Sequence, residues 1–583
     1  MLVEKGRVFG SLDSTGPGPR LLKVLVLALL LGTFTVAYLR TAWVSEDAFI
    51  TFRVVDNLLS GLGPVWNPGE RVQVYTHPLW FGLLTLPAWA GVEPYYASLA
   101  LSYLLTLCTL ALLVLTLGGV NLRSVLVLAM LLWSRAFIDY SSSGLENPLT
   151  HALLALYMAV FLNRQDSDAK ALQLSGLVAA LFLCRPDAII LVLPSWIAWW
   201  MAHRQSWRRL WPQALWGLAP AVLWVLFSLF YYGSPVPNTA LAKVQTGASG
   251  WQHAAQAWAY LGWSVREDPV TVAVLLMGIV MAFLVRDRSV RWLGFGLLLW
   301  GLYLVRVGAD YMGGRFFSGA VLIALVVMGR YLAGLGASVL WAIPLMLSSH
   351  LGTLQLTLLS PPDFRRPVIH ASGIADERGF YYRHLGLLPT MFRGGQVDHP
   401  WLAEGRELAS RPGWYTRCTI GMSGYAAGPA VRFVDPLALS EPFLARLPAR
   451  HGARVGHYER AFPPGFLESV VSGENRIEDP VLKALYADVD LAVRAPLLAP
   501  GRIGAILRLN LGHHDVAESS FERESIGLPG VPVVTRGPFS CYGLPYGGDH
   551  TWRLAVDERG TARVEPTRVV TERRPATGGR PAS

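Results

Sequence analysis

Charged residues are scarce in this chain: Asp, Glu, Lys and Arg make up 15% of its 583 residues, whereas hydrophobic residues make up 52%. So little charge excludes an intrinsically disordered protein and disfavours an ordinary soluble enzyme. Lysine is scarcer still, at five of the 50 basic residues, and cysteine occurs only four times. The net charge of +10 comes without a basic patch interleaved with aromatic residues. Nucleic acid is therefore not the expected partner.

The charge that is present is unevenly distributed. Residues 1–360 hold 39 of the 90 charged residues, and the shorter stretch 361–583 holds 51. Two different solvents are implied, lipid for the first part and water for the second. The sequence predicts an α-helical polytopic membrane protein with a C-terminal α+β soluble domain. The expected division is a cytoplasmic N-terminus at 1–20, a transmembrane module at 21–360, an extracytoplasmic domain at 361–564 and a disordered tail at 565–583.

Eleven apolar segments are long enough to be read as crossings of about 30 Å of hydrocarbon. The first should stay in the membrane as a signal anchor, because no small-residue cleavage site follows it. Residues 78–92 are apolar but short and contain Pro87, so they are expected to form an interfacial helix within the first outer loop, 41–94. The predicted spans are 21–40, 95–118, 124–140, 146–163, 171–185, 187–202, 211–232, 269–286, 292–307, 316–333 and 337–358.

The loop charges orient these spans. With a cytoplasmic N-terminus, the inner side receives fourteen basic and five acidic residues, and the outer loops receive nine basic and eleven acidic ones. The positive-inside rule favours this arrangement. It predicts a multi-pass protein of the plasma membrane whose C-terminal domain is extracytoplasmic.

Acids, amides and isolated cations gather in the predicted outer loops, where a hydrophobic bundle does not need them in order to fold. Each cluster also has an ordinary structural reading: a capped helix, a Pro-containing turn, a snorkelling lysine or a loop ion pair. Taken together they suit a lipid-phosphate donor that meets an acceptor at the membrane surface. The clusters are 45–53 with 65–80, 142–147, 185–187, 232–243 and 308–317.

Several segments in this order resemble one family. They are EDAFITFR (46–53), GLGPVWNPGERVQVYTHPLW (61–80), GLEN (144–147), RPDA (185–188), GSPVPNTALAK (233–243), GADYMGGRFF (308–317), VDPLALSEPFLARLPA (434–449) and VGHYERAFPPGFLES (455–469). Their order and spacing is similar to that of the terminal β-(1→2)-arabinofuranosyltransferases of mycobacteria and corynebacteria, within the GT-C superfamily of polyprenyl-phosphate-sugar glycosyltransferases. The resemblance runs from about residue 20 to 555.

The resemblance implies a GT-C fold and an enzyme that moves a sugar, arabinofuranose in that family, from a polyprenyl-phosphate donor to a polysaccharide or glycolipid of the cell envelope. It implies that Asp47 is the essential acid and Glu46 its partner, although many relatives have Asp-Asp there. Arg53, Lys243 and Arg315 would hold the donor phosphate. The substrate pocket would be shaped by His77, Glu146, Arg185, Asp187, Asn238, Asp310 and Tyr311.

The family's reaction is understood to proceed with net retention, which leaves a covalent intermediate on a carboxylate or front-face attack as alternatives. The sequence does not choose between them. A divalent cation beside the paired acids is a further possibility, but no ligand set with diagnostic spacing is present. The His513-His514-Asp515 run is better explained as a polar turn than as a metal site.

In the C-terminal domain the sequence predicts strands in the apolar, β-branched runs 431–434, 503–509 and 531–534, and helices at 437–447 and 480–490. The strands are expected to form a sandwich-like sheet. Cys418 and Cys541 can form a disulfide in an oxidising compartment, and two unpaired thiols are the alternative.

Two other functions fit a polytopic chain. A transporter or flippase predicts ionisable residues near the middle of spans, whereas the acids here fall at span ends. A non-catalytic envelope or motility factor predicts that loss of Asp47 is tolerated.

Overall fold

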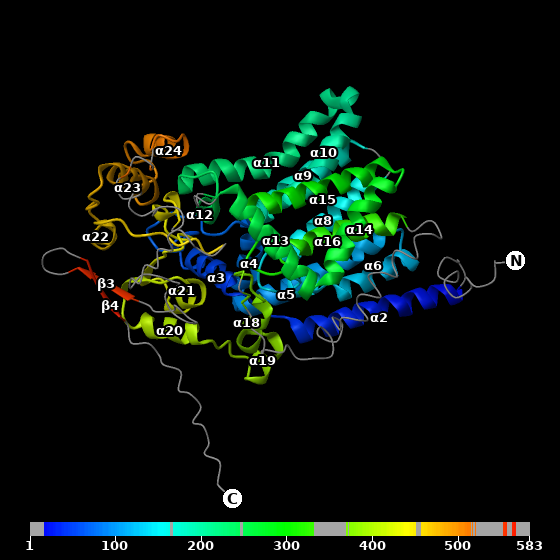
Figure 1. Cartoon of the computed structure of the whole chain (residues 1–583), viewed down its shortest axis with the longest axis horizontal. Coiled ribbons are helices and arrows are strands. Elements are labelled where there is room, and N and C mark those ends of the chain that lie inside the picture. Colours follow the sequence, from blue (N-terminus) through cyan, green and yellow to red (C-terminus); the bar gives the residue numbers. More distant parts are fainter. Residues whose placement is uncertain are drawn as a thin grey trace, which may run out of the picture.

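The computed structural model describes residues 17–163, 167–244, 249–331, 369–370, 372–449, 456–514, 516, 519, 552–556 and 562–566. The first part of the chain is a bundle of helices, seen on the right of Figure 1. The later helices and strands lie mostly to the left of this bundle in the same view. The helices up to residue 331 are α2 (Pro17–Thr41), α3 (Glu46–Leu59), α4 (Pro78–Trp89), α5 (Pro94–Thr116), α6 (Leu122–Trp133), α7 (Arg135–Asp139), α8 (Asn147–Leu162), α9 (Asp168–Cys184), η2 (Pro186–Ala188), α10 (Ile189–Ala202), η3 (Arg204–Ser206), α11 (Trp207–Tyr232), α12 (Asn238–Val244), α13 (Gly250–Glu267), α14 (Pro269–Leu284), α15 (Arg288–Val307) and α16 (Phe317–Tyr331).

Nine of the eleven predicted spans coincide with a described helix, 124–140 is divided between α6 and α7 at Ser134, and 337–358 lies outside the described residues. Four helices are both long and apolar enough to cross a membrane: Leu21–Thr41, Pro94–Thr116, Arg204–Tyr232 and Arg288–Val307. A fifth span results if α13 and α14, which meet at a bend of 114°, are counted as one. The apolar helices make this a membrane-embedded protein, and the number of crossings stays a prediction.

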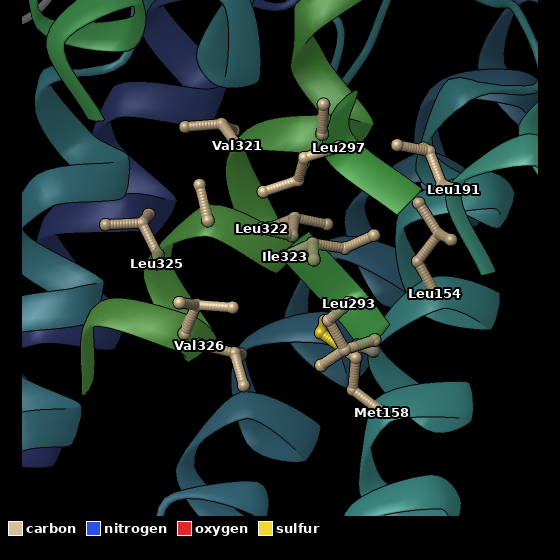
Figure 2. Packing of buried hydrophobic residues seen from close by; sticks show 14 of the residues in the cluster. Leu154, Met158, Leu191, Leu293, Leu297, Val321, Leu322, Ile323, Leu325 and Val326 are labelled. Carbon is tan, nitrogen blue, oxygen red and sulfur yellow. The ribbon is translucent and has the colours of Figure 1, made fainter. Parts of the chain in front are cut away.

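Helix α16 forms the centre of the bundle. Every residue from Ala320 to Gly329 is buried, so this helix is apolar on all sides rather than on one stripe. Figure 2 shows Leu322, Ile323 and Val326 of α16 packed among Leu154 and Met158 of α8 and Leu293 of α15. A helix enclosed in this way has little freedom to move, and it fixes the loop that precedes it, residues 308–316.

Helix α4 matches the predicted interfacial segment 78–92 and contains Pro87. Its 12 residues give a length of about 18 Å, too short to cross the hydrocarbon core. Its N-cap, His77, belongs to the site described below.

The chain after residue 369 combines short helices with one four-stranded sheet of order β2-β1-β3-β4. Strand β1 pairs parallel with β2 and antiparallel with β3, and β3 pairs antiparallel with β4. Among the described residues the sheet is single, not a sandwich. The elements are α18 (Glu377–Leu385), α19 (Leu387–Phe392), α20 (Pro400–Ala409), β1 (Gly413–Thr416), α21 (Gly421–Ala427), β2 (Val431–Val434), η6 (Leu444–Arg446), α22 (Phe466–Ser472), α23 (Pro480–Val493), α24 (Arg502–Asn510), β3 (Trp552–Val556) and β4 (Ala562–Pro566).

Two local predictions for this region are confirmed and two are wrong. Strand 431–434 and helix 480–490 are present as β2 and α23. Residues 503–509 form helix α24 instead of a strand, and they bury Ala505 and Ile506 on one helical face. Residues 437–447 are not a continuous helix, because the Asp435 carboxylate accepts the backbone N–H groups of residues 437, 439 and 440 and holds a turn. The predicted strand 531–534 lies outside the described residues.

Candidate active site

The predicted acid Asp47 lies in the first turn of α3, directly after the first predicted span. Ser45 caps this helix, with its hydroxyl oxygen 3.3 Å from the Asp47 N–H nitrogen. The Tyr311 hydroxyl donates a hydrogen bond to Asp47 Oδ2 at 3.1 Å across 264 residues of sequence. Asp47 is partly exposed, whereas Tyr311 is buried. The carboxylate is thus held in position by one hydrogen bond and stays accessible to a ligand.

Glu146 is the centre of a buried ion-pair network beside this acid. Its side chain is 1% exposed, and its Oε1 lies 3.0 Å from Arg315 Nη2 and 3.3 Å from Arg185 Nη1. Its Oε2 lies 3.4 Å from His77 Nδ1. Three loops that are far apart in the sequence therefore converge on one carboxylate, and two guanidinium groups keep that carboxylate ionised.

Arg185 and Asp187 form a second pair in the network. Arg185 Nε lies 3.0 Å from Asp187 Oδ1, and the guanidinium carbon lies 4.6 Å from the centre of the Phe316 ring. The segment 185–187 is a turn, as its Pro predicts, and η2 begins at Pro186. The turn also supplies charge to the network, so the structural and the functional readings of this segment are compatible.

His77 is neutral in this setting. Burial lowers the pKa of His77 to about 4, and the neighbouring Glu146 only partly offsets this effect. Its Nε2 lies 2.9 Å from the Thr51 hydroxyl of α3. His77 therefore links α3, α4 and Glu146 without adding a charge, and Thr51 joins the site through it.

Loop 308–316 carries Asp310, Tyr311 and Arg315. Gly308, Ala309 and Gly314 have positive φ angles of 79°, 57° and 79°, so the loop folds back on itself between α15 and α16. Asp310 Oδ1 accepts the Tyr311 N–H at 2.8 Å, and Asp310 Oδ2 lies 3.8 Å from Arg315 Nη1. One compact loop thus presents an acid, a phenol and a cation to Asp47 and Glu146.

We call these eight residues the carboxylate–guanidinium cluster: Asp47, His77, Glu146, Arg185, Asp187, Asp310, Tyr311 and Arg315. With four carboxylates, two guanidinium groups and a neutral histidine, its formal charge is −2. Several of its buried polar atoms have no hydrogen-bond partner among the described residues, which leaves them available to a bound molecule. These atoms are Glu146 Oε2, Asp310 Oδ2 and Arg315 Nε.

Arg53, a predicted phosphate-binding residue, is placed elsewhere. It is buried, and its guanidinium donates to the carbonyl oxygens of Trp66 at 2.9 Å, Val431 at 2.7 Å and Gly424. The guanidinium carbon also lies 4.2 Å from the centre of the Trp66 ring. All three nitrogen atoms are thus used in joining α3 to residues 424–431, so the geometry does not favour phosphate binding by Arg53.

We expect Arg53→Met to destabilise the fold by about 3 kcal/mol, because three buried carbonyl oxygens lose charged donors. The midpoint of thermal unfolding in detergent measures this effect. Arg411→Met is the matched control, since Arg411 is exposed. Equal midpoints for the two variants would contradict the structural role of Arg53.

Glu46 also has a structural role, because it binds backbone groups and not a neighbour in the cluster. Its Oε1 accepts the backbone N–H groups of Gly421 at 2.5 Å and Met422 at 3.2 Å, at the start of α21. Burial raises the pKa of Glu46, the adjacent Asp47 raises it further, and the two backbone hydrogen bonds act in the opposite direction. Glu46 joins α3 to α21, whereas Asp47 contacts loop 308–316.

We expect Glu46→Gln to fold like the wild type, because the amide oxygen still accepts both N–H groups, and Glu46→Ala to cost about 1–2 kcal/mol. The raised pKa fixes the sign of the pH dependence. In the wild type the unfolded chain loses this proton first, so stability falls as pH rises above the ordinary value of 4.5. The thermal midpoint of Glu46→Gln minus that of the wild type should therefore be larger at pH 8 than at pH 5. An equal difference at the two pH values would contradict a raised pKa for Glu46.

The remaining predicted site residues lie outside the cluster or outside the described residues. The Asn238 side-chain amide donates to the carbonyl oxygens of residues 438, 439 and 441, at 2.8 to 3.3 Å, and so connects α12 to the turn that follows β2. Lys243 is exposed at the end of α12. Cys418 is disulfide-bonded, and its predicted partner Cys541 lies outside the described residues. Of the three predicted phosphate-binding cations, only Arg315 belongs to the cluster.

The described residues contain no group of three or more His, Cys, Asp or Glu side chains that could hold a metal ion. Glu46 and Asp47, the pair beside which a divalent cation was considered, bind different partners on different sides of α3. Their arrangement does not fit a shared ion.

Sequence reasoning missed a second charged network. Arg135 Nε lies 3.2 Å from Asp139 Oδ2, and Arg135 Nη2 lies 2.5 Å from Asp376 Oδ2. Arg378 Nη1 lies 3.0 Å from Asp139 Oδ1. The spacing of Arg135 and Asp139 on one helix was a usable signal, but their connection to residues 376–378 depends on tertiary structure.

Two curated proteins are similar to this chain over most of its length. The "Terminal beta-(1->2)-arabinofuranosyltransferase" of Mycobacterium tuberculosis is 26% identical over 581 residues, covering 78% of this chain and 89% of the relative. The protein of the same name from Corynebacterium glutamicum is 23% identical over 537 residues, covering 76% of this chain and 77% of the relative. The chain is a homologue of these two transferases. The extent of these two alignments confirms the resemblance to terminal arabinofuranosyltransferases that the motifs indicated.

Among solved structures, the chain is similar to ArnT from Cupriavidus metallidurans bound to undecaprenyl phosphate, with a TM-score of 0.48 and 13% identity. The match covers 73% of this chain and 89% of ArnT. No family model matches the sequence.

Proposed function

We propose that this protein is a membrane glycosyltransferase that moves a sugar, arabinofuranose in the first instance, from a polyprenyl-phosphate donor to a cell-envelope polysaccharide or glycolipid. The observation that supports this most strongly is the similarity to two arabinofuranosyltransferases across more than three quarters of the chain. The proposal places the reaction at the outer face of the plasma membrane, with the N-terminus cytoplasmic and the region after residue 361 extracytoplasmic.

The carboxylate–guanidinium cluster suits this chemistry. Asp47 is accessible and oriented by Tyr311, so it can accept the proton of an attacking acceptor hydroxyl or attack the anomeric carbon itself. Arg315 is the cluster cation whose Nε lacks a hydrogen-bond partner among the described residues, and this donor can bind an oxygen of the leaving lipid phosphate. Glu146 and Arg185 hold Arg315 and its loop in place.

The acids of the cluster lie where helices begin or in loops, not in the middle of spans. Asp47 is in the first turn of α3, Glu146 is the N-cap of α8, and Asp310 lies between α15 and α16. This placement supports chemistry at the membrane surface over a path through the bilayer, which would need ionisable groups at mid-span.

The test is transfer by the purified protein in nanodiscs. Polyprenyl-phosphate arabinofuranose labelled in the sugar is supplied with an arabinan oligosaccharide, and the same polyprenyl phosphate carrying mannose or glucose serves for comparison. Label in the oligosaccharide supports the proposal, and its largest value should come from the arabinofuranosyl donor. Transfer from a hexosyl donor alone would overturn the choice of sugar. If the protein transfers no sugar from any of these donors, or only hydrolyses them, the proposed reaction is overturned.

A further inference from the structure

Helix α13 exposes an apolar face that the proposed reaction does not use. Trp251 is 81% exposed, Trp258 is 67% exposed and Val265 is 49% exposed. Residues seven apart lie on the same face of a helix. Ala255 and Gly262 fall between them on that face and are also exposed. A single exposed tryptophan needs no explanation. Two tryptophans aligned on an apolar stripe indicate a surface that contacts a membrane or another molecule.

The opposite face of α13 supports loop 308–316, which carries Asp310, Tyr311 and Arg315. The Tyr260 hydroxyl oxygen lies 3.3 Å from the Phe316 N–H nitrogen and 3.4 Å from the Met312 carbonyl oxygen. The Trp263 ring lies against Gly313 so closely that a Cβ there would clash with it. The loop therefore rests on the buried side chains of this helix.

The surroundings of α13 identify what covers its exposed face. The helix bends by 114° into the apolar helix α14 and packs against α15, one of the helices apolar enough to span a membrane. Leucines and valines are also exposed along α14 and α15: Leu276, Val280, Leu298, Leu299 and Leu302. Both helices fall in predicted spans, whose exposed apolar side chains meet hydrocarbon, and α13 packs against both of them.

The composition of the stripe matches the border of a membrane rather than its centre. Tryptophan is enriched where hydrocarbon meets headgroups, because its ring is apolar and its indole N–H needs a polar partner. Gln252 and Arg266 are exposed on one flank of the stripe, where they can reach headgroups and water. An amphipathic helix that turns sharply from a span lies in the plane of the interface.

We infer that α13 is an interfacial helix, with Trp251 and Trp258 inserted among lipids, and that its anchoring sets the position of loop 308–316 relative to the membrane surface. The second half of this inference rests on the proposed function, because the loop then meets a donor whose lipid tail stays in the bilayer. The first half concerns the lipid contact alone and is independent of the reaction.

The lipid contact can be tested without measuring activity. Single cysteines replace Trp251, Trp258 or Val265 on the stripe, or Gln252 or Arg266 on its flank, in a Cys108→Ser background, because Cys108 is the exposed free cysteine of the described residues. Each variant is spin-labelled, checked by mass for one label per chain, and reconstituted into phosphatidylcholine and phosphatidylglycerol vesicles. Collision with oxygen, which concentrates in lipid, is compared with collision with a water-soluble nickel chelate.

We expect labels at 251, 258 and 265 to favour oxygen and labels at 252 and 266 to favour nickel. Equal nickel access at all five positions would overturn the inference, since the stripe would then face water. Protection from both reagents at 251, 258 and 265 would also overturn it, because a protein partner would then be covering the face.

The effect on loop position has a kinetic test. Trp251→Gln with Trp258→Gln should raise the KM for the polyprenyl-phosphate donor roughly three- to tenfold and leave the KM for the soluble acceptor unchanged. Gln252→Ala with Arg266→Ala is the matched control on the flank, and its donor KM should move less. Unchanged donor KM in a protein with lipid-facing labels would overturn the coupling to the loop, while absence of transfer in the wild type would be a failure of the proposed function.

Discussion

Replacing Asp47 by Asn should lower kcat for sugar transfer by about 10²- to 10⁴-fold, the usual contribution of a positioned acid–base group. Asparagine keeps the shape of the side chain and an oxygen to accept the Tyr311 hydroxyl, which lies 3.1 Å from the carboxylate. What it loses is the charge that takes up a proton or attacks the sugar. The measurement is transfer of labelled sugar from the polyprenyl-phosphate donor, with thermal unfolding measured on the same preparation.

Asp56→Asn is the matched control for this variant. Asp56 is half-buried, lies nine residues further along α3 and is outside the cluster, so the same chemical change should leave transfer within about twofold of the wild type. The two variants should unfold at similar temperatures. Wild-type transfer by the Asp47 variant would exclude this carboxylate as base or nucleophile.

Replacing Glu146 by Gln should destabilise the protein by about 3–5 kcal/mol, because removing one partner leaves buried charges uncompensated. The carboxylate is 1% exposed and balances Arg315 at 3.0 Å and Arg185 at 3.3 Å. Among the described residues, the ion-pair partner that Arg315 would keep is Asp310, at the longer distance of 3.8 Å. Thermal unfolding in detergent should show a clear drop in midpoint, and transfer should fall as loop 308–316 loses its anchor.

Two comparisons separate this effect from a general intolerance of Glu→Gln changes. Glu267 is an ion-pair partner of Arg135, and the Glu267 side chain is 37% exposed. Arg135 keeps Asp139 and Asp376 in a Glu267→Gln variant, so the loss in stability should stay below about 1 kcal/mol. Adding Arg315→Met to Glu146→Gln should recover part of the stability, because the unpaired cation is gone, but should not restore transfer. A Glu146→Gln protein as stable as the wild type would contradict the role of Glu146 at the centre of the network.

The helices of the bundle could be predicted because their signal is local. A run of apolar residues reflects the environment in which it is buried, so nine predicted spans each coincide with a described helix. The exact count is harder to obtain, since several of those helices are short: α6 has 12 residues and α16 has 15. A short helix that is buried among other helices is as apolar in sequence as a helix that spans the membrane, so a single sequence does not distinguish the two.

The candidate site was predicted unevenly for a related reason. The structure brings Asp47, Glu146 and Arg315 into one cluster, and their roles in a site stay predictions. Arg53 and Glu46 lie on the same helix as Asp47, yet their partners are backbone atoms of residues 421, 422, 424 and 431. Every residue has a backbone carbonyl, so the sequence does not show which carbonyls bind a side chain. A buried Arg that binds carbonyls therefore looks in sequence like an Arg that binds phosphate.

The junction between α3 and residues 421–431 has a consequence for biosynthesis. Arg53 emerges from the ribosome 371 residues before Gly424 and 378 residues before Val431, whose carbonyl oxygens it binds. During that interval the cation can bind the nearby Trp66 carbonyl, but its two later carbonyl partners and the N–H groups that bind Glu46 have not yet been made. Asp47 is thus among the earliest residues of the cluster to be translated, but the helix that carries it is locked only after most of the chain has been made. Premature release of the chain would leave an inserted bundle with an unsupported acid, so translation order itself delays the assembly of the site.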